Sequence, residues 1–239
     1  MRHNKGCDAG VMKRLKADLH THACDDPYDV LPYSAEMLID AVAEAGVDVL
    51  AVTCHGTNVY GTRMAEYALR RHILLVPGSE LFIEGRHVVA LNPSREHMAA
   101  KTFDELRRAG RQNAAFFAPH PYYPSPRSLG GKLSRNADCF DAVEYASLYA
   151  TGLNLNRLAV RTARKHRLPM IGTTDTHSLP YYCETYSWLE AEPTVDGVID
   201  AIRQGRIEVS TKPRSWSRTI HAGAHALGGL AKDLVGLYE

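Results

Sequence analysis

The sequence lacks an excess of charge of either sign. Its 28 lysines and arginines nearly balance its 27 aspartates and glutamates, which gives a formal net charge of +1. Proteins that coat nucleic acid or bind membrane surfaces usually carry a marked basic excess. We therefore expect neither stable nucleic-acid binding nor membrane association.

Cysteine is scarce, and long apolar runs are missing. Five cysteines are scattered without a CxxC pair, at Cys7, Cys24, Cys54, Cys139 and Cys183. An odd, scattered set in a chain with no signal peptide fits a reducing compartment, so a cytoplasmic location is expected. No apolar run approaches the length of a membrane span.

Histidine is the residue type in excess, with 12 copies among 239 residues. A chain of this length can bury one full core, and α/β barrels of this size often form one domain. We expect a loose leader at 1–12, one domain at 13–210 and an extension at 211–239. In the extension, an amphipathic helix on the barrel or on a partner is predicted from Ile220, Ala224, Leu227, Leu230 and Leu234.

His20 and His22 form the first candidate metal-ligand pair. The alternation of Leu15, Ala17 and Leu19 with polar residues predicts a strand that leads into them. Residues two apart in a strand point to the same face, so both imidazoles would face one point. Two converging imidazoles supply half of a divalent-metal site.

Strands and helices alternate along the rest of the chain. Apolar runs predict strands at 47–52, 73–77, 114–119, 142–146, 169–174 and 186–189, and a hairpin at 81–91. Helical periodicity predicts helices that begin after Ser34 and that span 63–71, 102–108, 154–166 and 194–203. This alternation predicts a mainly parallel sheet, and about seven units are enough to close a barrel.

Ligand-type residues recur where the predicted strands end or begin. They are His20, His22, His55, Glu80, His120, Asp175 and His177, and His87 lies in the return strand of the hairpin. In parallel barrels the working residues sit at the carboxyl ends of the strands. Structural histidines would fall at random along their strands, so this placement predicts one shared site. The other histidines are expected at the surface or in loops: His3, His72, His97, His166, His221 and His225.

Four short motifs resemble those of the polymerase and histidinol phosphatase (PHP) superfamily of metal-dependent phosphoesterases. They are Asp18-Leu19-His20-Thr21-His22, Thr53-Cys54-His55, His120-Pro121 and Thr174-Asp175-Thr176-His177, with Gly78-Ser79-Glu80 between the second and third. The resemblance covers about 18–207. It implies a single-domain, distorted (β/α)7 TIM-like barrel with two or three divalent ions.

The resemblance also implies which residues bind each ion. His20, His22, Glu80 and Asp175 would surround one ion, and Glu80 would bridge to a second ion held by His87 and His120. A third ion would use His55, His177 and an acid from the loop after His22. Asp25, Asp26 and Asp29 compete for this last position, and we favour Asp26. Cys54 stands where the family usually has Asp, which leaves open what orients His55.

Imidazole and carboxylate ligands suit zinc, manganese or iron. The function implied is hydrolysis of a small phosphomonoester, of the nucleotide or amino-alcohol phosphate type, by metal-bound hydroxide. Catalytic roles fall to Glu80, Asp175 and His177. Arg127, Arg135 and Arg157 are candidates for binding the substrate phosphate.

Two alternatives keep the metal-dependent hydrolase class. One is phosphodiesterase or exonuclease-like activity, against which the balanced charge argues. The other is an amidohydrolase, which usually has a metal-bridging lysine on a middle strand, whereas the matching strand ends here carry Glu80 and His120. The expected partner is a small phosphorylated substrate, and a homo-oligomer is left open.

Overall fold

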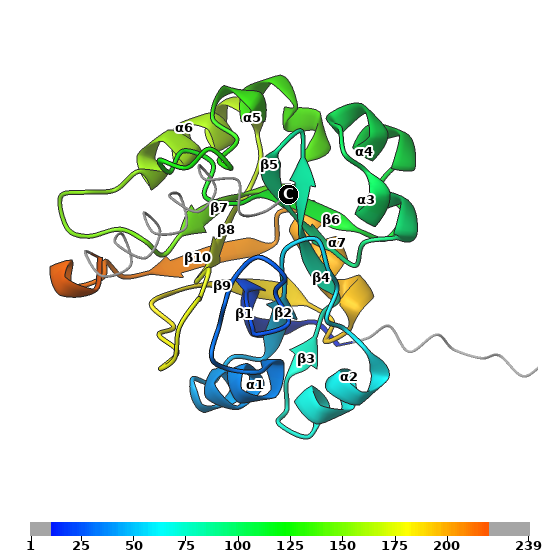
Figure 1. The fold of residues 1–239 in the computed structure, drawn as a ribbon, viewed down its shortest axis with the longest axis vertical. Helices are drawn as coiled ribbons and strands as arrows, with labels where there is room; N and C mark the ends of the chain where they lie inside the picture. Colours follow the sequence, from blue (N-terminus) through cyan, green and yellow to red (C-terminus); the bar gives the residue numbers. More distant parts are fainter. Residues whose placement is uncertain (1–10, 220–239) are drawn as a thin grey trace, which may run out of the picture.

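The computed structural model describes residues 11–219, in which strands occupy the centre and helices surround them (Figure 1). The strands form two mixed sheets of five strands each, in the orders β10-β9-β1-β2-β3 and β4-β5-β6-β7-β8. The predicted leader up to residue 10 and the predicted helix from Ile220 lie outside the described residues.

The first sheet is built around β1 (Lys13–Thr21), the strand predicted from Leu15, Ala17 and Leu19. On one side β1 pairs in parallel with β2 (Val49–Val52), which pairs in parallel with β3 (Leu74–Leu75). On the other side it pairs antiparallel with β9 (Thr185–Ala191), and β9 pairs antiparallel with β10 (Ile207–Thr211). The sequence did not lead us to predict β10.

The second sheet starts with the predicted hairpin. The hairpin consists of β4 (Gly78–Ile83) and β5 (Arg86–Leu91), and β5 continues antiparallel to β6 (Ala115–Ala118). From β6 the sheet runs in parallel through β7 (Ala142–Ala146) to β8 (Met170–Thr173). From the sequence, Gly78-Ser79-Glu80 was expected to end the strand before the hairpin. The segment instead begins β4.

The two sheets meet at the carboxyl ends of their parallel strands. Thr21 forms an isolated bridge with Thr176, and His55 forms one with Glu80. At the first junction the amide of Asp175 donates to the carbonyl of His20 at 3.0 Å. Elsewhere the Ser187 hydroxyl joins β9 to Gly172 of β8. The hydrogen bonds thus define two mixed sheets and not a closed ladder of seven parallel strands, because the hairpin, β9 and β10 run antiparallel to their neighbours.

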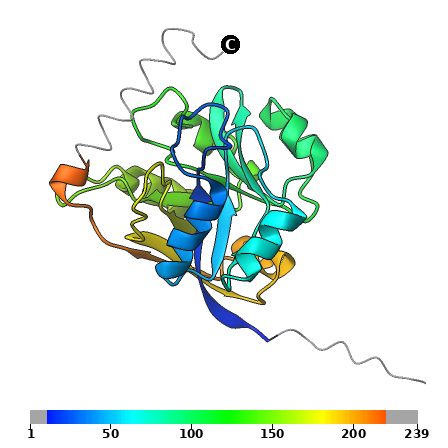
Figure 2. The same ribbon diagram turned by 60° about the horizontal axis from the view of Figure 1, so that its bottom comes forward.

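Helices cover the outer faces of the sheets (Figures 1 and 2). They are α1 (Ala35–Glu44), α2 (Thr62–Leu69), α3 (Arg95–Ala99), α4 (Phe103–Ala109), α5 (Gly131–Arg135), α6 (Asn156–His166) and α7 (Val195–Arg203), with a 3₁₀ turn at Ala137–Cys139. Ser34 caps α1 as predicted, since its hydroxyl accepts the amide hydrogen of Met37. No helix in this described part of the chain is both long and apolar enough to cross a membrane.

Met37 on α1 and Leu158 on α6 are 51% and 45% exposed, because neighbouring residues on these helices take the inner positions. His97 was expected at the surface, yet it is fully buried. Its ring completes a capping box on α3 by accepting the Ser94 amide hydrogen at 2.9 Å, and Nε2 donates to the carbonyl of Gly110.

Candidate metal centre

The carboxylate of Glu80 lies among five imidazoles. Oε2 is 3.2 Å from His20 Nε2, 3.4 Å from His22 Nε2 and 3.1 Å from His55 Nε2. Oε1 is 2.7 Å from His87 Nδ1 and 3.2 Å from His120 Nε2. The position of Glu80 in β4, beside the end of β2, brings together side chains from β1, β5 and three strand ends.

His20 and His22 are fully buried and face the same cluster, as predicted. Nδ1 of His20 donates to Glu144 at 2.8 Å, and Nδ1 of His22 donates to Asp26 at 2.8 Å. Both Nε2 atoms lie 3.4 Å from Oδ1 of Asp175. Because each Nδ1 carries the donated hydrogen, the neutral form of each ring would present the Nε2 lone pair toward the centre.

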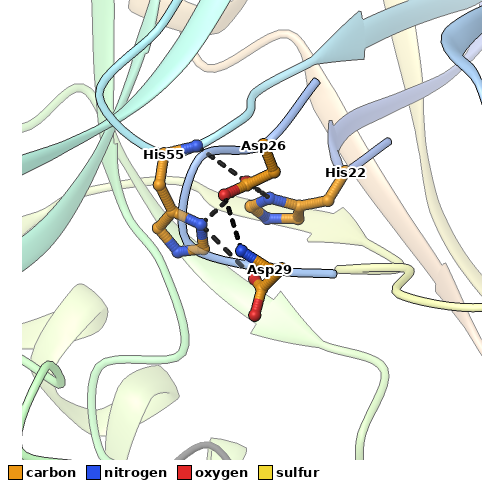
Figure 3. Close-up of side chains that lie close together, drawn as sticks. All are labelled: His22, Asp26, Asp29 and His55. Carbon is orange, nitrogen blue, oxygen red and sulfur yellow. Dashed lines mark hydrogen bonds and ion pairs between the residues drawn. The ribbon is translucent and has the colours of Figure 1, made fainter. Parts of the chain in front are cut away.

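Asp26 joins two histidines from different strands (Figure 3). Its Oδ2 accepts hydrogen bonds from Nδ1 of His22 and Nδ1 of His55, both at 2.8 Å, and from the amide of His55 at 2.9 Å. Its Oδ1 accepts the backbone amides of Tyr28 and Asp29, which shapes the loop. Asp29 approaches from the more exposed side, with Oδ2 3.5 Å from His55 Nδ1.

Asp175 and His177 close the cluster on the β8 side. Nδ1 of His177 donates to the carbonyl of Asp175 at 3.0 Å, and Nε2 lies 3.2 Å from Oδ2 of Asp29. The His177 ring stacks on His22 with a centroid distance of 4.3 Å. Asp175 and His120 have positive φ values of 49° and 27°, a strained backbone that concentrates at functional sites.

The electrostatics of the cluster come from burial and from the carboxylates it encloses. Burial lowers the pKa of His55, but Glu80 and Asp26 outweigh this effect and raise it to about 9. The pKa values of His20, His22 and His120 are raised in the same way, against burial, by neighbouring carboxylates. Burial lowers the pKa of His87 to about 4. Burial would raise the pKa of Glu80, but the surrounding imidazoles hold it well below its usual value.

The donor atoms converge in four overlapping groups, and within each group they lie within 4.8 Å of one another. The groups are His22-Asp26-Asp29-His55, His20-His22-Asp175, His20-Glu80-His120 and His55-Glu80-His87. Three buried atoms of the cluster have no hydrogen-bond partner, namely His22 Nε2, His87 Nδ1 and Asp175 Oδ1. Buried polar atoms are normally satisfied, so unsatisfied donor atoms that converge on shared points fit a bound cation.

Comparisons with known proteins agree with this geometry. The profile of a family described as PHP-associated matches residues 154–207. The motifs that resemble the PHP superfamily meet in one cluster at the strand ends. The chain is thus similar to the PHP superfamily in these motifs and in the matched segment. No curated protein matches the sequence.

Solved structures share the fold of this chain at low identity. PsfC from Pseudomonas syringae is 17% identical, with a TM-score of 0.62 over 90% of this chain and 98% of that one. A Bifidobacterium adolescentis protein, provisionally named a metal-dependent phosphoesterase, is 15% identical, with a TM-score of 0.50 over 68% and 87%. The lesion-specific endonuclease PfuEndoQ from Pyrococcus furiosus is 12% identical, with a TM-score of 0.57 over 84% of this chain and 60% of its own.

Two buried acids support the histidine cluster without having been assigned roles from the sequence. Glu144, in the middle of β7, accepts hydrogen bonds from His20 Nδ1, the His120 amide and the Thr173 hydroxyl. Asp18 accepts hydrogen bonds from Thr174 and Tyr181, and burial raises its pKa to about 6. The available signal for Glu144 was a carboxylate inside an apolar strand, which needs partners when it is buried.

Cys54 does not replace the missing family aspartate. Its side chain is buried, its Sγ donates to the carbonyl of Ala23 at 3.8 Å, and burial raises its pKa to about 11. It is therefore a packed, neutral thiol. His55 is oriented by Asp26 through Nδ1, which answers the question that Cys54 had left open.

The three predicted phosphate-binding arginines differ in position. Arg127 lies over the Phe82 ring, 5.2 Å from its centroid, and Phe82 in turn contacts the rings of His55 and His87. Arg135 and Arg157 are exposed on α5 and α6. Within residues 11–219, no hydrogen bond or ion pair links either of them to the cluster.

Proposed function

We propose that this protein is a member of the PHP superfamily and that it hydrolyses a phosphomonoester bond in a small substrate with the help of two or three divalent ions, of zinc, manganese or iron. The observation that carries the proposal is the Glu80 carboxylate among five imidazoles at the junction of the two sheets. The enzyme class, a metal-dependent hydrolase, is supported by the PHP-type motifs and by the match of residues 154–207 to the PHP-associated family. The distorted (β/α)7 barrel of the superfamily is part of the proposal.

The residues present fit such ions. His20, His22, Glu80 and Asp175 would hold one ion, while Glu80, His87 and His120 would hold a second. His55, His177 and an acid of the loop after His22 would hold the third. Oδ2 of Asp26 already accepts three hydrogen bonds, so this carboxylate also orients the histidines on either side of it.

Divalent ions at this centre would lower the pKa of a coordinated water and neutralise phosphoryl charge. The chain itself supplies the orientation. Glu144, Asp26 and the Asp175 carbonyl fix the Nδ1 hydrogens of four histidines, so that the Nε2 atoms of His20, His22, His55 and His177 face the centre. We infer direct attack by water, because the cluster contains no serine or cysteine paired with a histidine in the manner of an activated nucleophile.

Phosphate is the substrate group favoured by the cations near the centre. Arg127 lies over the Phe82 ring, and this ring contacts the rings of His55 and His87. PfuEndoQ is an endonuclease, so a phosphodiester in DNA belongs in the substrate panel even though this chain has a balanced net charge. An amide substrate is less favoured, because the clusters contain Glu80 and His120 and no lysine.

The test is metal analysis combined with a phosphate-release screen. We expect at least two equivalents of metal after reconstitution and release of inorganic phosphate from a phosphomonoester. The panel should include a nucleotide, an amino-alcohol phosphate, an oligonucleotide with an abasic site and an N-acyl compound. Glu80→Gln should lose most of the metal and the activity, because it removes one charge from a carboxylate shared by five imidazoles.

Stereochemistry then tests direct attack by water. Turnover of a chiral phosphate substrate in ¹⁸O-labelled water should place one solvent oxygen in the product with inversion at phosphorus. Net retention would indicate a phospho-enzyme. Hydrolysis of the N-acyl compound alone, or of the oligonucleotide alone, would replace the monoester proposal with the corresponding alternative.

A further inference from the structure

Arg214 lies on the segment after β10 and contacts the end of β8, directly before Asp175. It lies three residues after β10, where its amide donates to the carbonyl of Tyr149 at 2.9 Å and it bridges Ala150 in parallel. These contacts bind the segment after β10, coloured orange in Figure 1, to the loop that follows β7. The segment thereby lies beside the strand ends that carry the cluster.

The guanidinium of Arg214 is largely buried next to Asp175. Its side chain is 14% exposed. Nη2 donates to the Ser147 hydroxyl at 2.5 Å and to the Thr174 carbonyl at 3.5 Å, and Thr174 immediately precedes Asp175. The Ser147 hydroxyl in turn donates to the same carbonyl at 2.6 Å. Arg214 is thus held to the backbone from which Asp175 projects.

This guanidinium is not satisfied by a carboxylate of its own. Nε of Arg214 has no hydrogen-bond partner, and neither has Oε2 of Glu184, which lies 3.9 Å away. Oε1 of Glu184 instead accepts a hydrogen bond from Arg218 at 2.5 Å, and Arg218 also lies over the Tyr182 ring. Burial, together with the charge of Arg218, lowers the pKa of Arg214, which agrees with an incompletely compensated cation.

We propose that Arg214 binds the phosphoryl group of the substrate beside Asp175. A buried guanidinium with a free Nε matches an anion with several oxygens, because its planar fork can donate two parallel hydrogen bonds to phosphate. Its position is complementary to that of Arg127, which lies on the His55 and His87 side of the cluster. This inference rests on the proposed function, since it names the residue that holds the substrate of that reaction.

The test compares Arg214→Gln and Arg214→Lys with Arg218→Gln. Arg218 is a matched control because it lies on the same segment and contacts the same acid, Glu184, yet within residues 11–219 it makes no hydrogen bond with Ser147 or Thr174. For each metal-loaded variant we would measure metal content, thermal unfolding, KM, kcat and the affinity for inorganic phosphate by titration calorimetry. Phosphate affinity is a readout that does not depend on turnover.

We expect Arg214→Gln to keep its metal content and to lose phosphate affinity by about tenfold or more, the usual size of a charge-assisted hydrogen bond. KM should rise by a similar factor, Arg214→Lys should recover part of the loss, and Arg218→Gln should match the wild type. Unchanged phosphate affinity in Arg214→Gln would overturn the inference. An equal loss in Arg218→Gln would also overturn it, because the effect would then come from the Glu184 contacts.

The two proposals fail in different ways. If the wild type releases phosphate from a monoester but Arg214→Gln binds phosphate and substrate normally, the inference fails and the proposed function stands. If the wild type binds phosphate through Arg214 but releases none from any ester, the proposed function fails and the anion site stands. Should Arg214→Gln fold poorly, Arg214→Lys keeps the charge and allows the same titration.

Discussion

Asp26 is the acid that joins His22, a ligand of the first proposed ion, to His55, a ligand of the third. It is 6% exposed, and its Oδ2 accepts three hydrogen bonds from His22 and His55. Those contacts hold the pKa of its carboxyl well below the usual value, although burial acts in the opposite direction. Asp29 is more exposed and makes longer contacts with the imidazoles of His55 and His177.

Asp26→Asn should therefore weaken metal binding by roughly 10- to 100-fold, as the loss of an orienting carboxylate usually does. Asp29→Asn should have a smaller effect. Competition with a metal chelator, followed by elemental analysis, measures both, and Asp29→Asn is the matched control in the same loop. A larger loss in Asp29→Asn would show that Asp29 supplies the third ion's carboxylate and that Asp26 was assigned wrongly.

At the scale of single residues, the sequence predicted the side chains that carry recognisable chemistry. His20 and His22 lie together because period-two spacing follows from the geometry of a strand. Glu144 and Arg214 were not assigned. Their importance depends on which strands become neighbours, and one sequence does not state that. Similarly, His97 is buried only because α3 packs its capping histidine against Gly110.

At the scale of elements, Gly172 shows how closely β8 must approach its neighbours. A Cβ at this position would lie 2.7 Å from the carbonyl oxygen of Tyr186 in β9 and 2.9 Å from Val209 in β10. Both distances are shorter than real Cβ contacts, so one of the strands would have to move. Since Asp175 follows Gly172 by three residues, displacement of β8 would also displace the metal centre.

Gly172→Ala should destabilise the protein by about 1–3 kcal/mol, the usual cost of overpacking, and should lower activity as well. Gly131→Ala is the matched control, because a Cβ there would meet only the end of the Arg135 side chain at 3.9 Å. We expect Gly131→Ala to be neutral. Urea unfolding with metal-dependent activity at each concentration measures both effects, and a Gly172→Ala variant as stable as wild type would contradict the packing.

The elements themselves were partly predictable. The hairpin of β4 and β5 followed from its turn residues, and α1 followed from its Ser34 cap. The strand β10 was missed because it is short and only half-buried, so its apolar alternation is weak. The pairing of the strands into two sheets was not predictable either, since strand order and direction depend on contacts between distant segments.

At the scale of the whole molecule, the cluster joins the two sheets and couples metal binding, protonation and stability. Without metal, the raised pKa values of His20, His22, His55 and His120 mean that the cluster holds extra protons near neutral pH. Metal ions bind to the deprotonated imidazole, so loading should release protons, and apparent metal affinity should fall as the pH is lowered. Activity should accordingly decline below about pH 6, where protonation competes with metal.

The same protons set the pH dependence of the metal-free protein. The folded-state pKa of His55 is raised from 6.5 to about 9, so the folded protein binds more protons than the unfolded chain between these values. The resulting stability is fully present below pH 6.5 and is lost as the pH rises through 9, by at most roughly 3 kcal/mol for His55 alone.

The melting temperature of chelator-treated protein should therefore fall from pH 6.5 to 9. Metal-loaded protein should show a weaker or opposite trend, because its histidines are already deprotonated. Thermal unfolding of both forms across this range measures the difference, and a metal-free melting temperature that is constant or rises with pH would contradict the protonated cluster.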